Sequence, residues 1–220
     1  MARLARVVVA NTPHLVTQRG NGGAKTFFSD ADYGLYLKLL TAACAAAKVR
    51  CLGFVLMPNH VHLILVPRDA DGLRKAMSTV HRAYAGQINA RRKKTGHFWQ
   101  GRFGCVAMDG DHALSALRYV LLNPVRAKLC KKPEQWEWSS ARTYLKGRDD
   151  GITDTSDLLA LYPDIKLLLA DRPEQEMAEI ALRRSESIGR PLGSPAFIEK
   201  LERKLGRILK PGKRGPKPAK

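Results

Sequence analysis

The sequence predicts an α+β fold in which four strands and two helices follow one another in the order βαββαβ. Two apolar runs, 51–57 and 60–66, are joined by Pro58-Asn59, a pattern typical of a β-hairpin. A long segment with helical periodicity lies on each side of this hairpin, at 29–48 and 71–94. One strand before and one strand after these segments complete the order, which is that of the ferredoxin-like motif.

The remaining elements each have a local signal. Apolar residues in 6–17 predict an interrupted first strand, and Ser29 is a favourable N-cap for the first helix, with acidic residues in the turn that follows. Residues 103–108 predict the last strand. A third helix begins near Asp111, and we expect it to end before Pro124 because a residue that precedes proline is disfavoured in the α region.

A change of composition near Arg148 divides the chain. We expect a sheet domain, an acidic connector, a pair of helices and a basic disordered tail, at residues 1–147, 148–172, 173–209 and 210–220. The second helix of the pair has Ser194 as N-cap and a proline at its first position. The glycine turn between the two helices fits a DNA-reading helix-turn-helix and a structural helical hairpin equally well.

The charge of the chain points to a polyanionic partner. The 38 Lys and Arg residues outnumber the 20 Asp and Glu residues, which gives 220 residues a net charge of +18. Solubility of a small domain needs a net charge of only about 2–8 in magnitude. So basic a chain is typical of nucleic-acid binding. No apolar run is long enough to span a bilayer, so a membrane is not an expected partner.

A pair of histidines at the start of the second hairpin strand forms the first candidate site. His60 and His62 lie two residues apart, so on a strand both side chains point to the same face. Two neighbouring imidazoles can bind one divalent ion. By itself this pattern fits two unrelated histidines on a solvated sheet face better than a metal site, so a second observation is needed.

The third helix supplies that observation. Tyr119 and Asn123 are one helical turn apart and share a face. A tyrosine hydroxyl, with a pKa near about 10, is a weak nucleophile at neutral pH, and a divalent metal bound to the target phosphate would offset this weakness. The alternatives are a core aromatic at Tyr119 and a helix C-cap at Asn123. Tyr84 is the rival nucleophile, but no amide or carboxylate lies four residues after it.

Three ordered motifs resemble those of the REP-associated tyrosine transposases, which are bacterial relatives of the single-tyrosine HUH transposases. The motifs are LMPNHVHL, GHFWQGRF and RYVLLNPVRA, at residues 56–63, 96–103 and 118–127. Residues 17–21 and 138–140 are also similar to that family. The resemblance covers about residues 7–144.

The resemblance implies a ferredoxin-like HUH domain that cuts single-stranded DNA near hairpins, with an added helix that carries the nucleophile. It implies that Tyr119 forms a covalent 5′-phosphotyrosine and leaves a free 3′-hydroxyl. His60, His62 and Asn123 are implied as the metal ligands. The implied metal is Mg²⁺ or Mn²⁺, of which Mn²⁺ suits imidazole better because Mg²⁺ prefers oxygen ligands.

Cations interleaved with aromatic residues predict the surface that contacts DNA. Bases can stack on the rings of residues 91–102 while phosphates meet the cations. In the alternative, Phe98 and Trp99 anchor this loop in the core; we expect Trp99 to be structural and Arg102 to contact DNA. The expected DNA contacts are Arg19, Arg91, Arg92, Lys93, His97, Arg102, Arg118, Arg126, Lys213 and Arg214.

Three functions are compatible with these residues. The first is a transposition-related endonuclease and strand transferase that acts on single-stranded hairpins, with or without flanking duplex. The second is an RRM-like binding module, but RRM proteins display aromatic residues where this chain has His60 and His62. The third is a domesticated DNA-binding regulator without cleavage activity. We expect a monomer, with a dimer as the alternative, in the bacterial cytoplasm.

Overall fold

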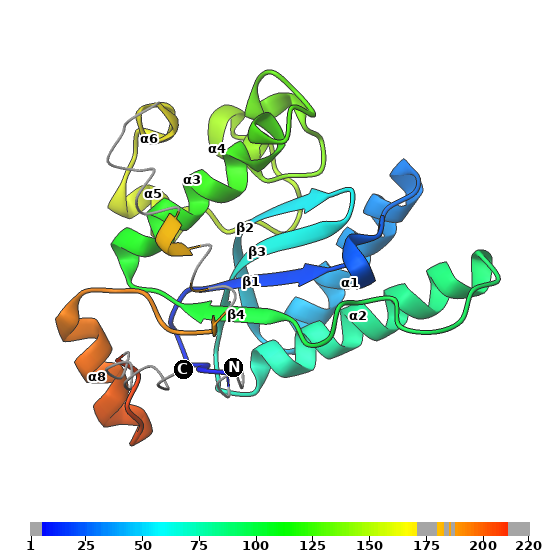
Figure 1. Ribbon diagram of the computed structural model, residues 1–220. Helices are drawn as coiled ribbons and strands as arrows, with labels where there is room; N and C mark the ends of the chain where they lie inside the picture. The colour runs from blue at the N-terminus through cyan, green and yellow to red at the C-terminus, as the bar shows by residue number, and fades with distance from the viewer. Residues whose placement is uncertain (1–5, 171–179, 183–184, 186–187, 211–220) are drawn as a thin grey trace, which may run out of the picture.

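A four-stranded antiparallel sheet lies between two layers of helices in the computed structural model, which describes residues 6–170, 180–182, 185 and 188–210 (Figure 1). The strands are β1 (His14–Arg19), β2 (Val49–Met57), β3 (His60–Pro67) and β4 (Gly104–Ala107). Their order in the sheet is β2-β3-β1-β4, and every neighbouring pair is antiparallel. This is the ferredoxin-like arrangement. The predicted fold class is therefore confirmed.

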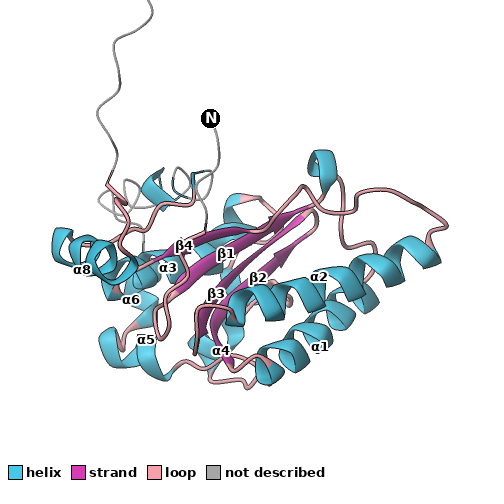
Figure 2. Cartoon of the chain, turned by 90° about the horizontal axis from the view of Figure 1, so that it is seen from below, coloured by secondary structure: helices cyan, strands magenta, loops and turns pink. Residues whose placement is uncertain are grey.

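The two faces of the sheet carry different helices. Helices α1 (Asp30–Ala46) and α2 (Gly72–Arg91) cover one face, and α3 (Gly110–Arg126) covers the other (Figure 2). On β3, Val61, Leu63 and Leu65 pack with the α1–α2 layer, whereas Ile64 and Val66 pack with α3. Strand alternation therefore sends the odd-numbered side chains of β3 to one core and the even-numbered side chains to the other.

Helix α3 is longer than the sequence predicts. The expectation that it ends before Pro124 is wrong, because the helix continues to Arg126 and includes the proline. A proline in a helix removes one backbone donor, and its ring crowds the carbonyl four residues earlier. Pro124 lies in the last turn, where the Ala127 amide still donates to the Asn123 carbonyl at 2.9 Å, and its ring is buried. Packing of α3 against the sheet thus outweighs the preference of the residue before Pro124 to leave the helical conformation.

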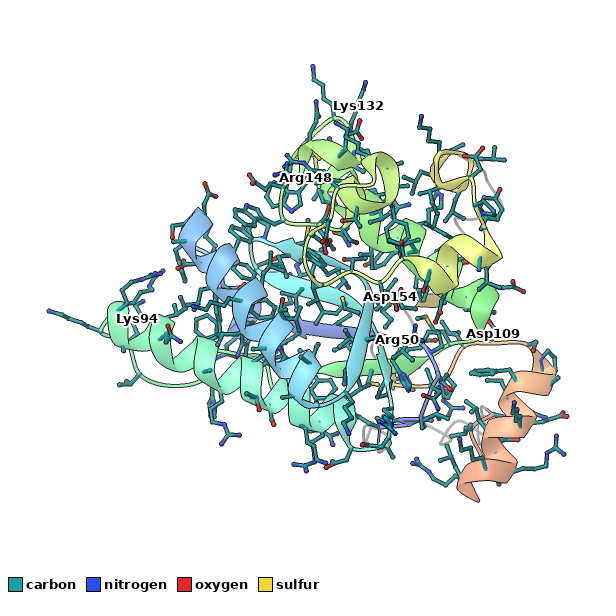
Figure 3. The ribbon with its side chains drawn as sticks, turned by 180° about the vertical axis from the view of Figure 1, so that it is seen from behind. Arg50, Lys94, Asp109, Lys132, Arg148 and Asp154 are labelled. Carbon is teal, nitrogen blue, oxygen red and sulfur yellow. The ribbon has the colours of Figure 1, made fainter. Side chains whose placement is uncertain are left out.

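The segment after the sheet domain packs on that domain. Three short helices follow α3, namely α4 (Ala141–Lys146), α5 (Ser156–Leu161) and α6 (Ile165–Leu169), and Leu158 and Leu168 join the core around α3. Arg50 of β2 forms an ion pair with Asp154, with 3.0 Å between Nη1 and Oδ2, and the two side chains lie together in Figure 3. An acidic residue of the expected connector thus forms an ion pair with a strand of the sheet.

The C-terminal residues cover the edge of β4. The Leu192 amide donates to the Ala107 carbonyl at 2.8 Å, which pairs an otherwise open strand edge. Helix α8 (Pro195–Leu205) follows, and the Ser194 hydroxyl accepts from the Phe197 amide at 3.2 Å, as expected of its N-cap. Its buried face packs with β4 and with the N-terminal segment through Leu201. The first helix of the expected pair lies mostly outside the described residues.

Two 3-10 turns and one strand-like segment connect or flank the strands and helices described above. The turns are η1 (Asn21–Gly23) after β1 and η2 (Pro133–Gln135) after α3. Residues 138–140 run along the free edge of β2: the Leu56 amide donates to the Trp138 carbonyl at 2.8 Å. No described helix has both the length and the apolar character needed to cross a membrane.

Candidate active site

His60, His62 and Tyr119 meet on the face of the sheet that α3 covers. The two imidazole centroids are 4.8 Å apart and the rings are nearly perpendicular. The His62 ring centroid is 5.2 Å from that of Tyr119, again nearly perpendicular. His62 and Tyr119 are 4% and 6% exposed, whereas His60 is half-buried. Residues far apart in the chain thus form one cluster.

Strand pairing explains why the histidines face α3. Residues directly opposite in an antiparallel pair have their side chains on the same face. On β2, Val55 lies opposite His62, and Val55 belongs to the core that packs on α3. On β1, Arg19 lies opposite His60, so this cation stands beside the site. The alternation that buries the apolar residues of β3 therefore also presents its two histidines to Tyr119.

Asn59 fixes the ring of His60. Its amide oxygen lies 2.6 Å from His60 Nδ1, and its amide nitrogen donates to the Gly23 carbonyl at 3.2 Å. An amide oxygen can only accept, so Nδ1 of His60 donates and Nε2 keeps its lone pair. Metal-binding histidines are commonly oriented in this way by a partner on the second ring nitrogen. Sequence reasoning missed Asn59, although it stands directly before His60 in the PNHVH motif.

The turn that carries Asn59 is itself held in place. The Gly20 amide donates to the Asn59 carbonyl at 2.9 Å, and the Thr26 amide donates to the Pro58 carbonyl at 2.8 Å. Gly20 is required at this close approach, because a Cβ there would overlap the Ala24 carbonyl oxygen. The segment 20–26 therefore supports the orientation of His60 through the Pro58-Asn59 turn.

The electrostatics of the site keep His60 neutral. Burial, together with smaller contributions from the neighbouring His62 and Arg19, lowers the pKa of His60 to about 3. A histidine must be neutral to bind a metal through nitrogen. His60 therefore has both the protonation state and the free Nε2 that a ligand needs at neutral pH.

The residues present fit a divalent metal with a mixed donor set. Within the described part of the chain, no third His, Cys, Asp or Glu joins the two histidines. Asn123 lies on α3 one turn after Tyr119 and is half-buried, so its amide oxygen is a candidate third donor. A site of two imidazoles with oxygen donors suits Mn²⁺ better than Mg²⁺, because Mg²⁺ prefers oxygen ligands. Further donors would have to be water or phosphate oxygens.

A second cation lies beside Tyr119. Arg126 places its guanidinium carbon 5.9 Å from the centroid of the Tyr119 ring, at the end of the same helix. Arg126 and Arg19 are both exposed. These two residues, both expected to contact DNA, therefore lie next to the clustered site residues.

The arginines at the end of α2 have structural partners. Arg91 pairs with the buried carboxylate of Asp32 at 2.6 Å, and the Arg92 guanidinium lies 3.6 Å above the Phe28 ring. Both arginines thus hold the start of α1 against the end of α2. Beyond them, the loop from 92 to 103 carries exposed side chains. Figure 3 labels one of these residues, Lys94, beside the end of α2. Three of the residues expected to contact DNA lie exposed in this loop, namely Lys93, His97 and Arg102.

This loop continues the sheet on the β4 side of β1. Gly20 and Trp99 form a bridge, and the Gln100 amide donates to the Arg19 carbonyl at 2.8 Å. Trp99 Nε1 donates to the His81 carbonyl at 2.9 Å, which anchors the loop on α2. The exposed cations of the loop are consequently held at the same end of the sheet as His60.

Arg118 is expected to contact DNA, but it is only 5% exposed in the structure, which does not favour that role. Its guanidinium donates to the carbonyls of Leu168 and Ala170 at 3.1 and 3.2 Å, which are at the end of α6. Helix C-termini leave carbonyls that need donors, and Arg118 supplies them. Lys213 and Arg214 lie outside the described residues.

Tyr84, the rival candidate nucleophile, lies in the core between α1 and α2. It is fully buried, on the opposite face of the sheet from the histidines. Its hydroxyl donates to the Thr26 carbonyl at 2.9 Å. The ring is therefore part of the structural core.

Comparison with known proteins agrees with this geometry. Residues 15–122, which contain His60, His62 and Tyr119, match the family model described as "Transposase IS200 like". A solved REP-associated tyrosine transposase bound to a REP hairpin is 19% identical, with a TM-score of 0.54 over 70% of this chain and 93% of that chain.

A candidate transposase from Deinococcus radiodurans is 14% identical, with a TM-score of 0.38 over 61% of this chain and 98% of that chain. No curated protein matches the chain. The predicted family is confirmed by the family model, and the fold is that of the REP-associated tyrosine transposase. Residues 15–122 of the chain thus match the IS200-like transposase family.

Proposed function

We propose that this protein is a metal-dependent enzyme that nicks single-stranded DNA at hairpins and transfers the strand, with Tyr119 as nucleophile. The observation that carries the proposal is the contact between the Tyr119 and His62 rings, with His60 next to them, within one chain. The basic residues around this cluster and the transposase family add support.

The proposed reaction is a transfer of a phosphoryl group to tyrosine. The Tyr119 hydroxyl loses its proton and its oxygen bonds to the scissile phosphorus, while the bond from phosphorus to the 3′ oxygen breaks. The leaving 3′ oxygen takes up a proton, which gives a free 3′-hydroxyl and a 5′-phosphotyrosine. Arg126, 5.9 Å from the Tyr119 ring, is placed to balance negative charge on the phosphate as this happens.

His60 and His62 would hold the metal, with Asn123 as a third donor. When bound, a divalent metal polarises the phosphate as a Lewis acid and orients it. Asn59 would keep His60 Nε2 aimed at the site through its hydrogen bond to Nδ1. Mn²⁺ and Mg²⁺ are the proposed metals.

The DNA partner is proposed from the relative and from the charge of the chain. That relative is described as bound to a REP hairpin, and single-stranded hairpins with or without flanking duplex are the proposed substrates here. The proposed contacts are Arg19, Lys93, His97, Arg102 and Arg126. Because His62 and Tyr119 of one chain already meet, a monomer is sufficient for the chemistry. We place the activity in the bacterial cytoplasm, where chromosomal DNA lies.

A covalent-trapping assay tests this proposal. Purified protein is mixed with labelled single-stranded hairpins from the flanks of its own gene, with and without Mn²⁺, and the products are run on a denaturing gel. We expect a metal-dependent protein–DNA adduct that disappears in Tyr119→Phe, because phenylalanine has no nucleophilic oxygen. Tyr84→Phe is the matched control and should keep the adduct.

The outcomes separate the candidate functions. An adduct that persists in Tyr119→Phe would contradict the assignment of the nucleophile. Tight hairpin binding without any adduct in the parent protein would favour a DNA-binding regulator over the enzyme.

A further inference from the structure

A basic cleft lies between η2 and α4, outside the cluster of His60, His62 and Tyr119. It has a volume of about 650 Å³. Six residues line it, namely Lys132, Glu134, Gln135, Arg142, Lys146 and Arg148. Figure 3 shows Lys132 and Arg148 in the same part of the molecule, well away from Lys94. None of these residues belongs to the motifs that resemble the transposases.

The cations of this cleft are available to a ligand. Lys132, Lys146 and Arg148 are exposed, and among the described residues none of them forms an ion pair. The neighbouring Asp150 carboxylate is already engaged by the Thr143 hydroxyl and by the Ile152 and Thr153 amides. Four cations facing one carboxylate, Glu134, leave the cleft with an excess of positive charge.

The walls of the cleft are held in a fixed relation to each other. The Arg142 Nε donates to the Glu134 carbonyl at 2.9 Å, which ties α4 to η2. The Gln135 side chain accepts from the Lys131 and Lys132 amides at 3.0 and 2.9 Å. The cleft is thus a formed feature, and a bound anion would meet cations that are already close together.

The topology places this cleft on the opposite flank of the active site from the loop of Lys93 and Arg102. Residues 138–140 extend the sheet beyond β2, and residues 98–101 extend it beyond β1. His60 lies on β3 between these two strands. A strand of DNA that crosses the site from the 98–101 side would therefore reach the η2–α4 side next.

We propose that the η2–α4 cleft is a second phosphate-binding site for the DNA that enters or leaves the active site. The inference rests on the proposed function for the identity of the anion, which is the phosphodiester backbone. Lys132, Lys146 and Arg148 bind phosphates of a single-stranded flank, and Arg142 supports them from the wall of the cleft. The site contributes affinity and alignment without reading the sequence, because phosphates are the same at every position.

The test measures binding in a Tyr119→Phe background, so that cleavage plays no part. Affinity for a labelled hairpin with single-stranded flanks, and for the same hairpin without flanks, is measured by fluorescence anisotropy across a range of salt. We expect Lys146→Ala/Arg148→Ala to weaken binding of the flanked hairpin roughly tenfold, with a salt slope smaller by about 0.7 for each phosphate that the variant no longer binds. Binding of the hairpin without flanks should stay unchanged.

Lys38→Ala/Arg82→Ala is the matched control. It removes the same two residue types from exposed positions of α1 and α2. Lys132→Ala/Lys146→Ala is a second test variant, and thermal unfolding of each variant verifies the fold. The proposal is overturned if both cleft variants bind the flanked hairpin as the parent does, or if the control loses as much affinity. Hairpin binding without cleavage by the protein with intact Tyr119 would contradict only the proposed function.

Discussion

A single hydrogen bond determines which ring nitrogen of His60 is available to bind a metal. His60 is held by Asn59, whose amide is oriented in turn by the Gly23 carbonyl. The same histidine has a pKa lowered to about 3, chiefly by burial. Because these two effects act together, His60 is neutral and exposes one defined nitrogen. We infer that the quality of the candidate metal site depends on Asn59 as well as on the ligands.

Asn59→Leu tests this dependence. Loss of the hydrogen bond to His60 Nδ1 should weaken Mn²⁺ binding and cleavage by about 10–100-fold, as is typical when a residue that orients a ligand is lost. Asn59→Asp keeps an acceptor for Nδ1 and should lose less. Mn²⁺ titration followed by electron paramagnetic resonance gives affinity without DNA. Equal Mn²⁺ affinity in Asn59→Leu and the parent would contradict the proposed role.

At the scale of elements, α3 connects the active site to the C-terminal half of the chain. Its inner face packs on the sheet, Tyr119 reaches His62, and Arg118 caps the last carbonyls of α6. One helix thus positions the candidate nucleophile and binds a segment about fifty residues later. The predicted acidic connector consequently packs on the sheet domain through α5 and α6.

Arg118→Ala should therefore lower stability and spare DNA binding. Removal of its hydrogen bonds leaves the carbonyls of Leu168 and Ala170 without that donor, which we expect to cost about 1.5–3 kcal/mol in the free energy of unfolding. Urea denaturation measures this change. Arg126→Ala is the matched control, because it is exposed beside Tyr119 and should lower DNA affinity more than stability. A large loss of affinity in Arg118→Ala with unchanged stability would contradict the structural assignment.

For the whole molecule, buried histidines make the fold sensitive to acid. Burial lowers the pKa of His14 to about 4 and that of His81 to about 3, against 6.5 for the free side chain. His81 lies between the helices, 3.2 Å from the Tyr36 hydroxyl. The unfolded chain takes up protons below about pH 6.5, whereas the folded chain does not until near pH 4. Stability is therefore full above about pH 6.5 and is lost as the pH falls towards about 4.

We expect the free energy of unfolding to fall between pH 7 and pH 5 by roughly 1–2 kcal/mol for each of these two histidines. Urea denaturation at the two pH values measures the change. His81→Gln should lower stability at pH 7 but reduce the dependence on pH. The exposed His97→Gln is the control and should leave that dependence as in the parent. A stability that does not change between these pH values would argue against neutral burial of His14 and His81.

Much of the fold follows from local patterns in the sequence. Alternation along 60–66 gives the two faces of β3, and Ser29 and Ser194 begin their helices as their local chemistry predicts. These features depend on residues near one another in the chain, so periodicity and capping reveal them. Pro124 shows the limit, because α3 continues through this buried proline to Arg126 in spite of its local effect.

The sequence by itself determined the order of the elements, the family and the candidate residues His60, His62 and Tyr119, because ordered motifs and periodicity are local properties. Only the tertiary structure showed that His62 and Tyr119 touch, that Asn59 orients His60, and that Arg118 is buried against α6. It also brought Lys132 and Arg148 into one cleft. Each of these depends on contacts between side chains whose rotamers and neighbours are fixed by packing, and no pattern along the chain specifies them.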